Sequence, residues 1–283
     1  MSYLKYIFQF IIILFFFLIF KIIGLKFSSL LSGKLFTLIG SLFRSDSICH
    51  KNLTIAFPNY NFKQRKQIIQ NMWFNYGCIF AEYIFIKNIK NSKNIIVENQ
   101  NTLEELKKTS DPVIFVSGHF NNFELMAMHI NNSGINLSAI YRPLNNMFLN
   151  PIMEKIRKKH ICEKQIKKGI TGTKELLKNF KNGSSIALMI DQRVSEGIKV
   201  KFFGQEASTT TIPAQFVKKF NTKIVPIYIE RENINEFKLK IYKPIGFKES
   251  DTIEMITIKL NEVLEKMIIK NPSQWIWTHN RWK

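Results

Sequence analysis

A histidine and a glutamate five positions apart, His119 and Glu124, are the residues of this chain best suited to acid–base chemistry. Histidine accepts a proton near neutral pH, and a nearby carboxylate can fix its tautomer and stabilise the imidazolium that forms. Five positions along one helix would point the two side chains to different faces, whereas a strand-to-helix turn can bring them together. A structural alternative stays open, because Asn121 and Glu124 also fit the N-cap and N3 positions of a helix.

Two more polar residues come directly after apolar runs that are typical of buried strands. Arg142 follows the run Asn136–Tyr141, and its guanidinium can contact a phosphate or polarise a carbonyl. Asp191 follows the run Ser185–Ile190. In a parallel sheet such residues lie at the carboxyl edge, where ligands gather. A surface ion pair for Arg142 and a helix cap for Asp191 are the alternatives.

The segments around these residues alternate along the chain between short apolar runs and helical patterns. This alternation predicts an α/β fold with a mostly parallel central sheet flanked by helices. The predicted strands are Pro112–Ser117, Asn136–Tyr141, Ser185–Ile190, Lys223–Glu230 and Phe237–Tyr242. The predicted helices are Asn61–Ile86, Asn121–Asn131, Met147–Lys159, Thr173–Lys181, Pro213–Phe220 and Thr252–Lys270.

The N-terminus carries an apolar run, Tyr6–Ile23, close to the roughly 20 residues that cross a bilayer core. No small-residue cleavage site follows, so we expect an uncleaved transmembrane anchor rather than a signal peptide. Basic residues after the run favour a cytoplasmic body. The segment Phe27–Phe43 mixes small, apolar and basic residues and is predicted to lie as a helix in the membrane interface. We therefore predict an anchor over residues 1–26 and one catalytic domain over 27–283.

Composition excludes several classes of protein. The chain of 283 residues has 41 Lys and Arg against 21 Asp and Glu, a net charge of +20, and 46% hydrophobic residues, too many for a disordered basic tail. Three widely spaced cysteines form neither a disulfide framework nor a metal knuckle. No P-loop, dinucleotide fingerprint or metal-binding motif is present, so we expect no cofactor and no metal. The basic excess, part of which reflects AT-rich coding bias, favours an anionic membrane surface over nucleic acid, since no nucleic-acid-binding module is recognisable.

Several sequence blocks, in order along the chain, carry a family resemblance. They are NLTIAFP at 52–58, GHFNNFE at 118–124, YRP at 141–143 with NN at 145–146, DQ at 191–192, FFG at 202–204 and QWIWTHNRW at 274–282. With these blocks the chain resembles the late acyltransferases of lipid A biosynthesis, the lauroyl/myristoyl transferases, and more distantly the glycerolipid acyltransferases with an H-x4-D/E motif.

The resemblance implies transfer of a fatty acyl chain from an acyl-carrier-protein thioester to a hydroxyl of an anionic glycolipid, a lipid A precursor. It implies a single-pass protein of the cell inner membrane with its catalytic domain on the cytoplasmic side. The resemblance also implies that His119 acts as the general base, that Glu124 orients it, and that no covalent enzyme intermediate forms. Arg142, Asp191 and, by a weaker local match, Arg157 are the implied substrate-binding residues.

Two other functions remain open from the sequence. One is acyl transfer to a different lipid acceptor, such as a phosphatidylinositol mannoside or an aminolipid. The other is an inactive lipid-binding membrane protein, which the joint presence of His119, Glu124, Arg142 and Asp191 disfavours. A covalent serine mechanism is disfavoured because no Gly-x-Ser-x-Gly elbow is present. The tryptophans of the last block are predicted to be core or interfacial aromatics.

Overall fold

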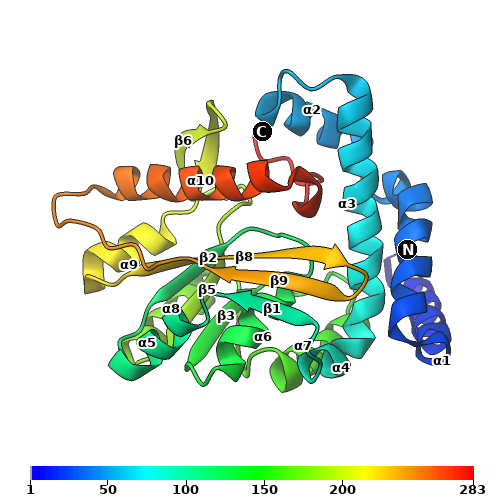
Figure 1. Cartoon of the computed structure of the whole chain (residues 1–283), viewed down its shortest axis with the longest axis horizontal. Helices are drawn as coiled ribbons and strands as arrows, with labels where there is room; N and C mark the ends of the chain where they lie inside the picture. The colour runs from blue at the N-terminus through cyan, green and yellow to red at the C-terminus, as the bar shows by residue number, and fades with distance from the viewer. Residues whose placement is uncertain (1) are drawn as a thin grey trace.

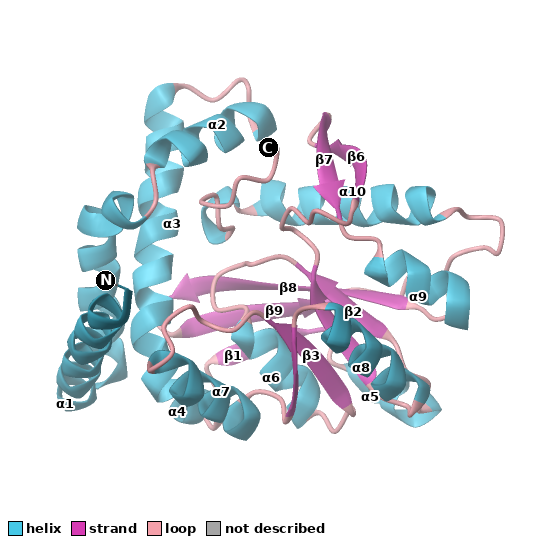
Figure 2. Ribbon diagram, turned by 180° about the vertical axis from the view of Figure 1, so that it is seen from behind, coloured by secondary structure: helices cyan, strands magenta, loops and turns pink. Residues whose placement is uncertain are grey.

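A seven-stranded sheet lies at the centre of residues 2–283, the part of the chain that the computed structural model describes (Figures 1 and 2). Its strand order is β1-β9-β8-β2-β5-β3-β4, and within this described part every neighbouring pair is parallel except β8 and β9. The strands are β1 Ile95–Glu98, β2 Ile114–Ser117, β3 Leu137–Tyr141, β4 Lys164–Lys167, β5 Ser185–Met189, β8 Ile224–Asn233 and β9 Glu236–Ile241. The predicted α/β class and the mostly parallel sheet are confirmed.

The strands predicted from the sequence form the middle of this sheet, with ends displaced by a few residues. The edge strands β1 and β4 were not predicted. Strand β4 reads KQIK and buries only Ile166, so it lacks the apolar run of a central strand. A separate antiparallel hairpin, β6 (Ile198–Phe202) and β7 (Gln205–Thr209), was also not predicted.

Helices lie on both faces of the sheet, with α10 over one face and α5, α6 and α8 over the other (Figures 1 and 2).

Helix α3 begins with a reciprocal capping box between Asn61 and Gln64, and Thr252 caps α10. The helices after α1 are α2 Asp46–Ala56, α3 Phe62–Glu82, α4 Ile86–Lys90, α5 Asn101–Thr109, α6 Glu124–Asn132, α7 Leu149–His160, α8 Ile170–Lys181, α9 Ile212–Phe220 and α10 Ile253–Lys270, with 3₁₀ turns η1 (Tyr83–Phe85) and η2 (Pro272–Gln274).

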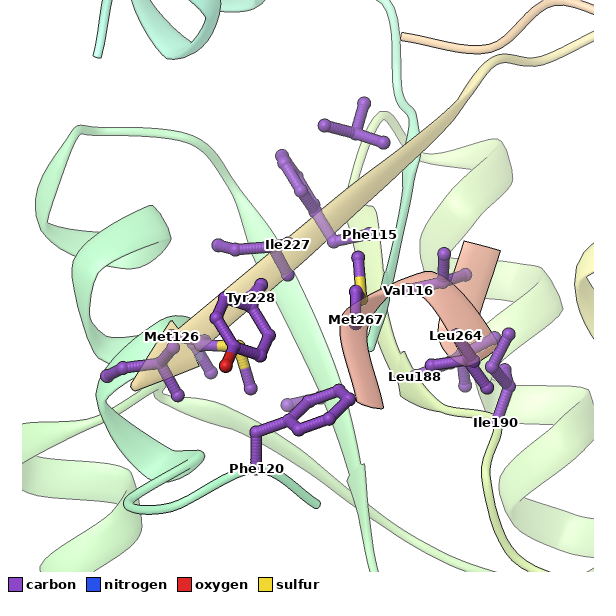
Figure 3. Close-up of a cluster of buried hydrophobic side chains, with 14 of the residues drawn as sticks. Phe115, Val116, Phe120, Met126, Leu188, Ile190, Ile227, Tyr228, Leu264 and Met267 are labelled. Carbon is purple, nitrogen blue, oxygen red and sulfur yellow. The ribbon is translucent and has the colours of Figure 1, made fainter. Parts of the chain in front are cut away.

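The core fills the space between the central strands and the helices that cover them (Figure 3). Phe115 and Val116 are consecutive in β2 and therefore point to opposite faces of the sheet. The close-up shows both of them with Leu264 and Met267 of α10 and Met126 of α6, all members of one buried cluster. All four residues of β2 are buried, which is expected of a strand covered on both faces. The core thus holds β2 rigidly just before the segment that carries His119.

The N-terminal helix α1 spans Ser2–Phe43 but is broken at Gly24, where φ is 78° and ψ is 167°. We call residues 2–23 the outer arm and residues 25–43 the inner arm. The inner arm packs closely on α3, because Gly77 leaves room for the backbone of Ser32. Between Tyr3 and Leu42 the helix is long and apolar enough to cross a membrane, by length and composition. The predicted interfacial helix over Phe27–Phe43 corresponds to most of the inner arm.

Candidate active site

His119 lies two residues beyond β2, at the carboxyl edge of the sheet. Strands β2 and β5 are parallel neighbours in which Ser117 pairs with Met189, so the residues two positions further along each strand face each other. Those residues are His119 and Asp191. Gly118 allows them to approach, because a Cβ at Gly118 would lie 3.2 Å from an oxygen of Asp191. Parallel pairing therefore places a carboxylate directly against the histidine.

The His119 ring is fixed by Asp191. Nδ1 of His119 lies 2.8 Å from Oδ1 of Asp191, and the backbone N–H of His119 donates to Oδ2 at 2.8 Å. The edge of the His119 ring also packs on Phe123, with 4.8 Å between ring centroids. The His119 side chain is 20% exposed, while that of Asp191 is 3% exposed. One nitrogen of the ring is thus held inside the protein, and the ring still reaches the surface.

The electrostatics of this pair favour one tautomer. Burial on its own would raise the pKa of Asp191, but His119, its backbone N–H and Trp275 lower that pKa to about 2. Burial on its own would lower the pKa of His119, but the Asp191 charge and hydrogen bond outweigh it and raise that pKa. An ionised Asp191 accepts a hydrogen bond from the N–H of Nδ1, so neutral His119 keeps its lone pair on Nε2.

Glu124 does not make the hydrogen bond to His119 that the sequence led us to expect. Its Oε1 accepts from Nε and Nη2 of Arg157 at 2.8 and 2.6 Å, and from the hydroxyl of Tyr83 at 2.7 Å. The position next to Nδ1 belongs to Asp191, which faces His119 across the strand pair. Glu124 still lies near enough for its charge to raise the pKa of His119.

The capping-box alternative for Asn121 and Glu124 is wrong. Asn121 has a positive φ of 38°, and α6 begins only at Glu124, after Phe123, which provides no side-chain cap. The side-chain oxygen of Asn121 accepts instead from the backbone N–H of Asn122 and from Arg231. Glu124 is 8% exposed and its carboxylate is occupied by side-chain donors, so it has a role other than capping a helix.

The remaining predicted site residues have different surroundings. Asp191 was expected to bind substrate, but Nδ1 of His119 contacts one of its oxygens, while the His119 backbone and Trp275 contact the other. Arg157, from α7, is held by Glu124 and stacks over Tyr141, and its Nη1 is buried without a hydrogen-bond partner in the described part of the chain. Arg142 follows β3 and is exposed at the same edge of the sheet, one strand beyond β5.

The C-terminal segment contributes to the site in a way that the sequence did not reveal. The indole N–H of Trp275 donates to Oδ2 of Asp191 at 2.8 Å. Phe120 and Trp275 form a β-bridge, and the backbone N–H of Asn121 donates to the carbonyl of Gln274. Trp275 and Trp277 are fully buried, as predicted for core residues. Trp275 therefore both fills the core and helps to hold Asp191 in its ionised form.

A buried ion pair lies beneath the loop that carries His119. Arg231 of β8 pairs with Glu82 of α3, and the two side chains hold both asparagines of the loop. Arg231 donates to Asn121 at 3.0 Å, and Asn122 donates to Glu82 at 2.9 Å. Asn235 also donates to Glu82, at 3.0 Å. Because Glu82 and Arg231 are 149 positions apart, no sequence pattern could have indicated this support.

Nothing among the described residues forms a metal site, since no three His, Cys, Asp or Glu side chains there cluster as ligands. The cysteines are poor nucleophiles. Cys49, Cys78 and Cys162 are all free and buried. Burial, the largest effect in each case, raises the pKa of Cys49 and Cys78 to about 12 and that of Cys162 to about 11. His119, with Nδ1 held by Asp191 and with Glu124 nearby, is a side chain at this edge that is suited to acid–base chemistry.

Comparison with known proteins places this chain in a family. The model of the bacterial lipid A biosynthesis acyltransferases matches residues 1–283. A lipid A biosynthesis acyltransferase of Haemophilus influenzae is 24% identical over 250 residues, covering 85% of this chain and 78% of its own. The lipid A biosynthesis palmitoleoyltransferase of Escherichia coli is 23% identical, covering 85% and 79%. The lauroyltransferase of the same organism is 22% identical, also covering 85% and 79%. The chain therefore belongs to the bacterial lipid A biosynthesis acyltransferase family, and it is an acyltransferase.

Proposed function

We propose that this enzyme moves a fatty acyl chain from an acyl-carrier-protein thioester to a hydroxyl of a lipid A precursor, with His119 as the general base. The observation that carries the proposal is the orientation of His119. Asp191 holds Nδ1, so the lone pair of Nε2 is left for the hydroxyl proton of the acceptor. A sugar or hydroxyacyl alcohol needs such a base to attack a thioester carbonyl near neutral pH.

The proposed step conserves atoms and charge. Nε2 of His119 takes the proton from the acceptor hydroxyl while the oxygen bonds to the thioester carbonyl carbon. The C–S bond then breaks, the carrier thiolate leaves, and the imidazolium returns the proton to the sulfur. An ester and a free thiol result. The buried thiols, with their raised pKa values, support direct transfer rather than an acyl-cysteine intermediate.

Glu124 and the arginines assist this step in the proposal. The charge of Glu124 stabilises the imidazolium through space, which follows from its effect on the pKa of His119. The Nη1 group of Arg157 can donate to the oxygen that becomes negative during transfer. Arg142, exposed at the same edge, is suited to a phosphate of the acceptor. Asp191 acts through His119 and is a positioning residue.

The proposed partners follow from charge and from the N-terminal helix. A net charge of +20 suits an acidic carrier protein and an anionic lipid surface. The apolar helix α1 suits attachment to the inner membrane, with the catalytic domain on the cytoplasmic side. The single-pass arrangement stays a prediction, and the packing of α1 on the domain favours a different one.

The test of this function is the mass of lipid A from a strain that lacks the gene. We expect lipid A that is lighter by one acyl chain, restored by the wild-type gene and not by His119→Ala. Lipid A of unchanged mass, with an acyl chain lost from another lipid class, would instead show that the acceptor is a different lipid. Parallel assays of the purified enzyme with acyl-carrier-protein and acyl-coenzyme A identify the donor. The carrier-protein rate is expected to fall as salt rises.

A further inference from the structure

The outer arm of α1 lies on the catalytic domain along most of its length, although it has the composition of a membrane span. Near Gly24, the rings of Phe17 and Phe20 pack on Phe80 of α3, with centroids 5.3 and 6.0 Å apart. Figures 1 and 2 both show α1 alongside α3. An anchor that simply left the domain to cross a membrane would make such contacts only near its domain end.

The far end of the outer arm is also attached to the domain. The side chain of Asn146, which is 7% exposed, donates to the backbone carbonyl of Tyr6 at 2.9 Å. The ring of Phe148 packs on Tyr3 and Phe10, with centroids 5.4 and 5.8 Å apart. Asn146 and Phe148 belong to the loop between β3 and α7, which begins with Arg142. From Tyr3 to Phe20 the attached stretch is about 25 Å long.

The face of the outer arm that turns away from the domain is apolar. On the outer arm it repeats at steps of four and three residues, so its members form one stripe. The members, each more than half exposed, are Leu4, Phe8, Ile11, Phe15, Leu18 and Ile22. The inner arm adds Phe27, Leu31, Leu38 and Leu42, with the exposed Lys34 on the same face. Fully burying a large apolar side chain stabilises by roughly 1.5–3 kcal/mol, and these partly exposed side chains lose much of that free energy in water. A surface of this size needs an apolar partner.

We propose that α1 is a monotopic anchor: both arms lie in the plane of the membrane on the side of the catalytic domain, with this stripe in the acyl chains. A helix that spanned the bilayer would carry Tyr3 and Tyr6 across a hydrocarbon core of about 30 Å. The loop with Asn146 would then have to enter the lipid, where unpaired loop backbone is very costly, or lose its contacts with α1. In the plane of the membrane every contact persists.

The basic residues of α1 fit the same arrangement. Lys5, Lys21, Lys26 and Lys34 are exposed along both arms, and long lysine side chains can reach the headgroup layer from a helix that lies in the interface. Together with the proposed function, this arrangement has a consequence for the site. The loop docked on the outer arm begins at Arg142, so docking of α1 holds the edge of the sheet next to the leaflet that contains the acceptor lipid.

Cross-linking in native membranes tests the proposal with the full-length protein. The native cysteines are all buried, so they give a low background. We expect a short bis-maleimide to join Tyr3→Cys to Phe148→Cys in membranes, and not to join the matched pair Leu18→Cys and Phe148→Cys. Leu18 lies on the exposed stripe about 22 Å further along the arm. A spanning helix predicts that the first pair fails to cross-link, and that result overturns the proposal.

Labelling from outside the inner membrane gives a second, independent readout. Lys5→Cys is expected to resist an impermeant maleimide in spheroplasts and to react after the membrane is opened, as does the control Lys283→Cys. Reaction of Lys5→Cys in intact spheroplasts, with Lys283→Cys still protected, also overturns the proposal. Both readouts work without enzymatic activity, so a failure of the proposed acyl transfer is distinguishable from a failure of this topology.

Discussion

Replacing Asp191 by asparagine changes the tautomer of His119 rather than its position. In the native protein Oδ1 of Asp191 faces Nδ1 of His119, and Oδ2 accepts from the His119 backbone and from Trp275, all at 2.8 Å. An asparagine has only one oxygen. If that oxygen keeps the two donors on the Oδ2 side, the amide nitrogen faces Nδ1, and His119 must carry its proton on Nε2.

The opposite orientation of the asparagine is less stable. It would leave two buried N–H groups without acceptors, at about 1–3 kcal/mol each. At the lower limit of about 2 kcal/mol, the working tautomer falls to a few per cent of the enzyme, because 1.4 kcal/mol is about a factor of ten. The imidazolium also loses its neighbouring charge. We therefore expect Asp191→Asn to lower the rate by about 10²–10⁴-fold, as for loss of a general base.

Glu124→Gln is the matched comparison. The glutamine oxygen can still accept from Arg157 and Tyr83, so the variant loses a charge but leaves the His119 tautomer unchanged. We expect a loss of about tenfold from the weaker stabilisation of the imidazolium. The assay is the initial rate of acyl transfer with the melting temperature of each variant. If Glu124→Gln is the more damaging change, or if Asp191→Asn stays within tenfold of wild type, Asp191 does not control the tautomer of His119.

Three further predictions concern pH, packing and the buried ion pair. Because Asp191 raises the pKa of His119, kcat/KM is expected to rise with pH through an apparent pKa above 6.5. An apparent pKa below 6.5 for this rise would contradict the effect of Asp191 on His119. Gly77→Ala would place a Cβ 2.2 Å from a backbone oxygen of α1, so it should lower the free energy of unfolding by about 1–3 kcal/mol. The control Gly246→Ala, where a Cβ would have nothing within 4 Å, should leave thermal unfolding unchanged. Arg231→Met leaves the carboxylate of Glu82 buried without its cation and should lower the free energy of unfolding by about 3–5 kcal/mol. A change below about 1 kcal/mol in denaturant titration would show that the ion pair does not stabilise the fold.

The sequence predicted the middle of the sheet and the edge where the polar residues lie. The runs around Val116, Leu188 and Ile227 are apolar because they are covered on both faces, and this signal is local. Strand β4, which buries one residue, gives no such signal. Helix α1 was predicted as two segments, and Gly24 marks the break between its arms.

The partner of His119 could not be predicted because it depends on strand order and register. Asp191 faces His119 only because β5 lies next to β2 with Ser117 opposite Met189. Glu124, five positions away, was the local choice, but Arg157 and Tyr83 hold it. The supporting residues lie far from His119 in the sequence, so their contacts form only when the sheet, α3 and the C-terminal segment come together.

The role of His119 as general base is tested by the rate of acyl transfer by purified His119→Ala, measured with acyl-carrier-protein donor and a lipid A precursor as acceptor. His119 is at the carboxyl edge of the sheet and partly exposed, so the variant is expected to keep the melting temperature of the wild type. We expect its rate to fall by about 10²–10⁴-fold. A folded His119→Ala enzyme that transfers acyl chains at close to the wild-type rate would contradict the role of His119 as the general base.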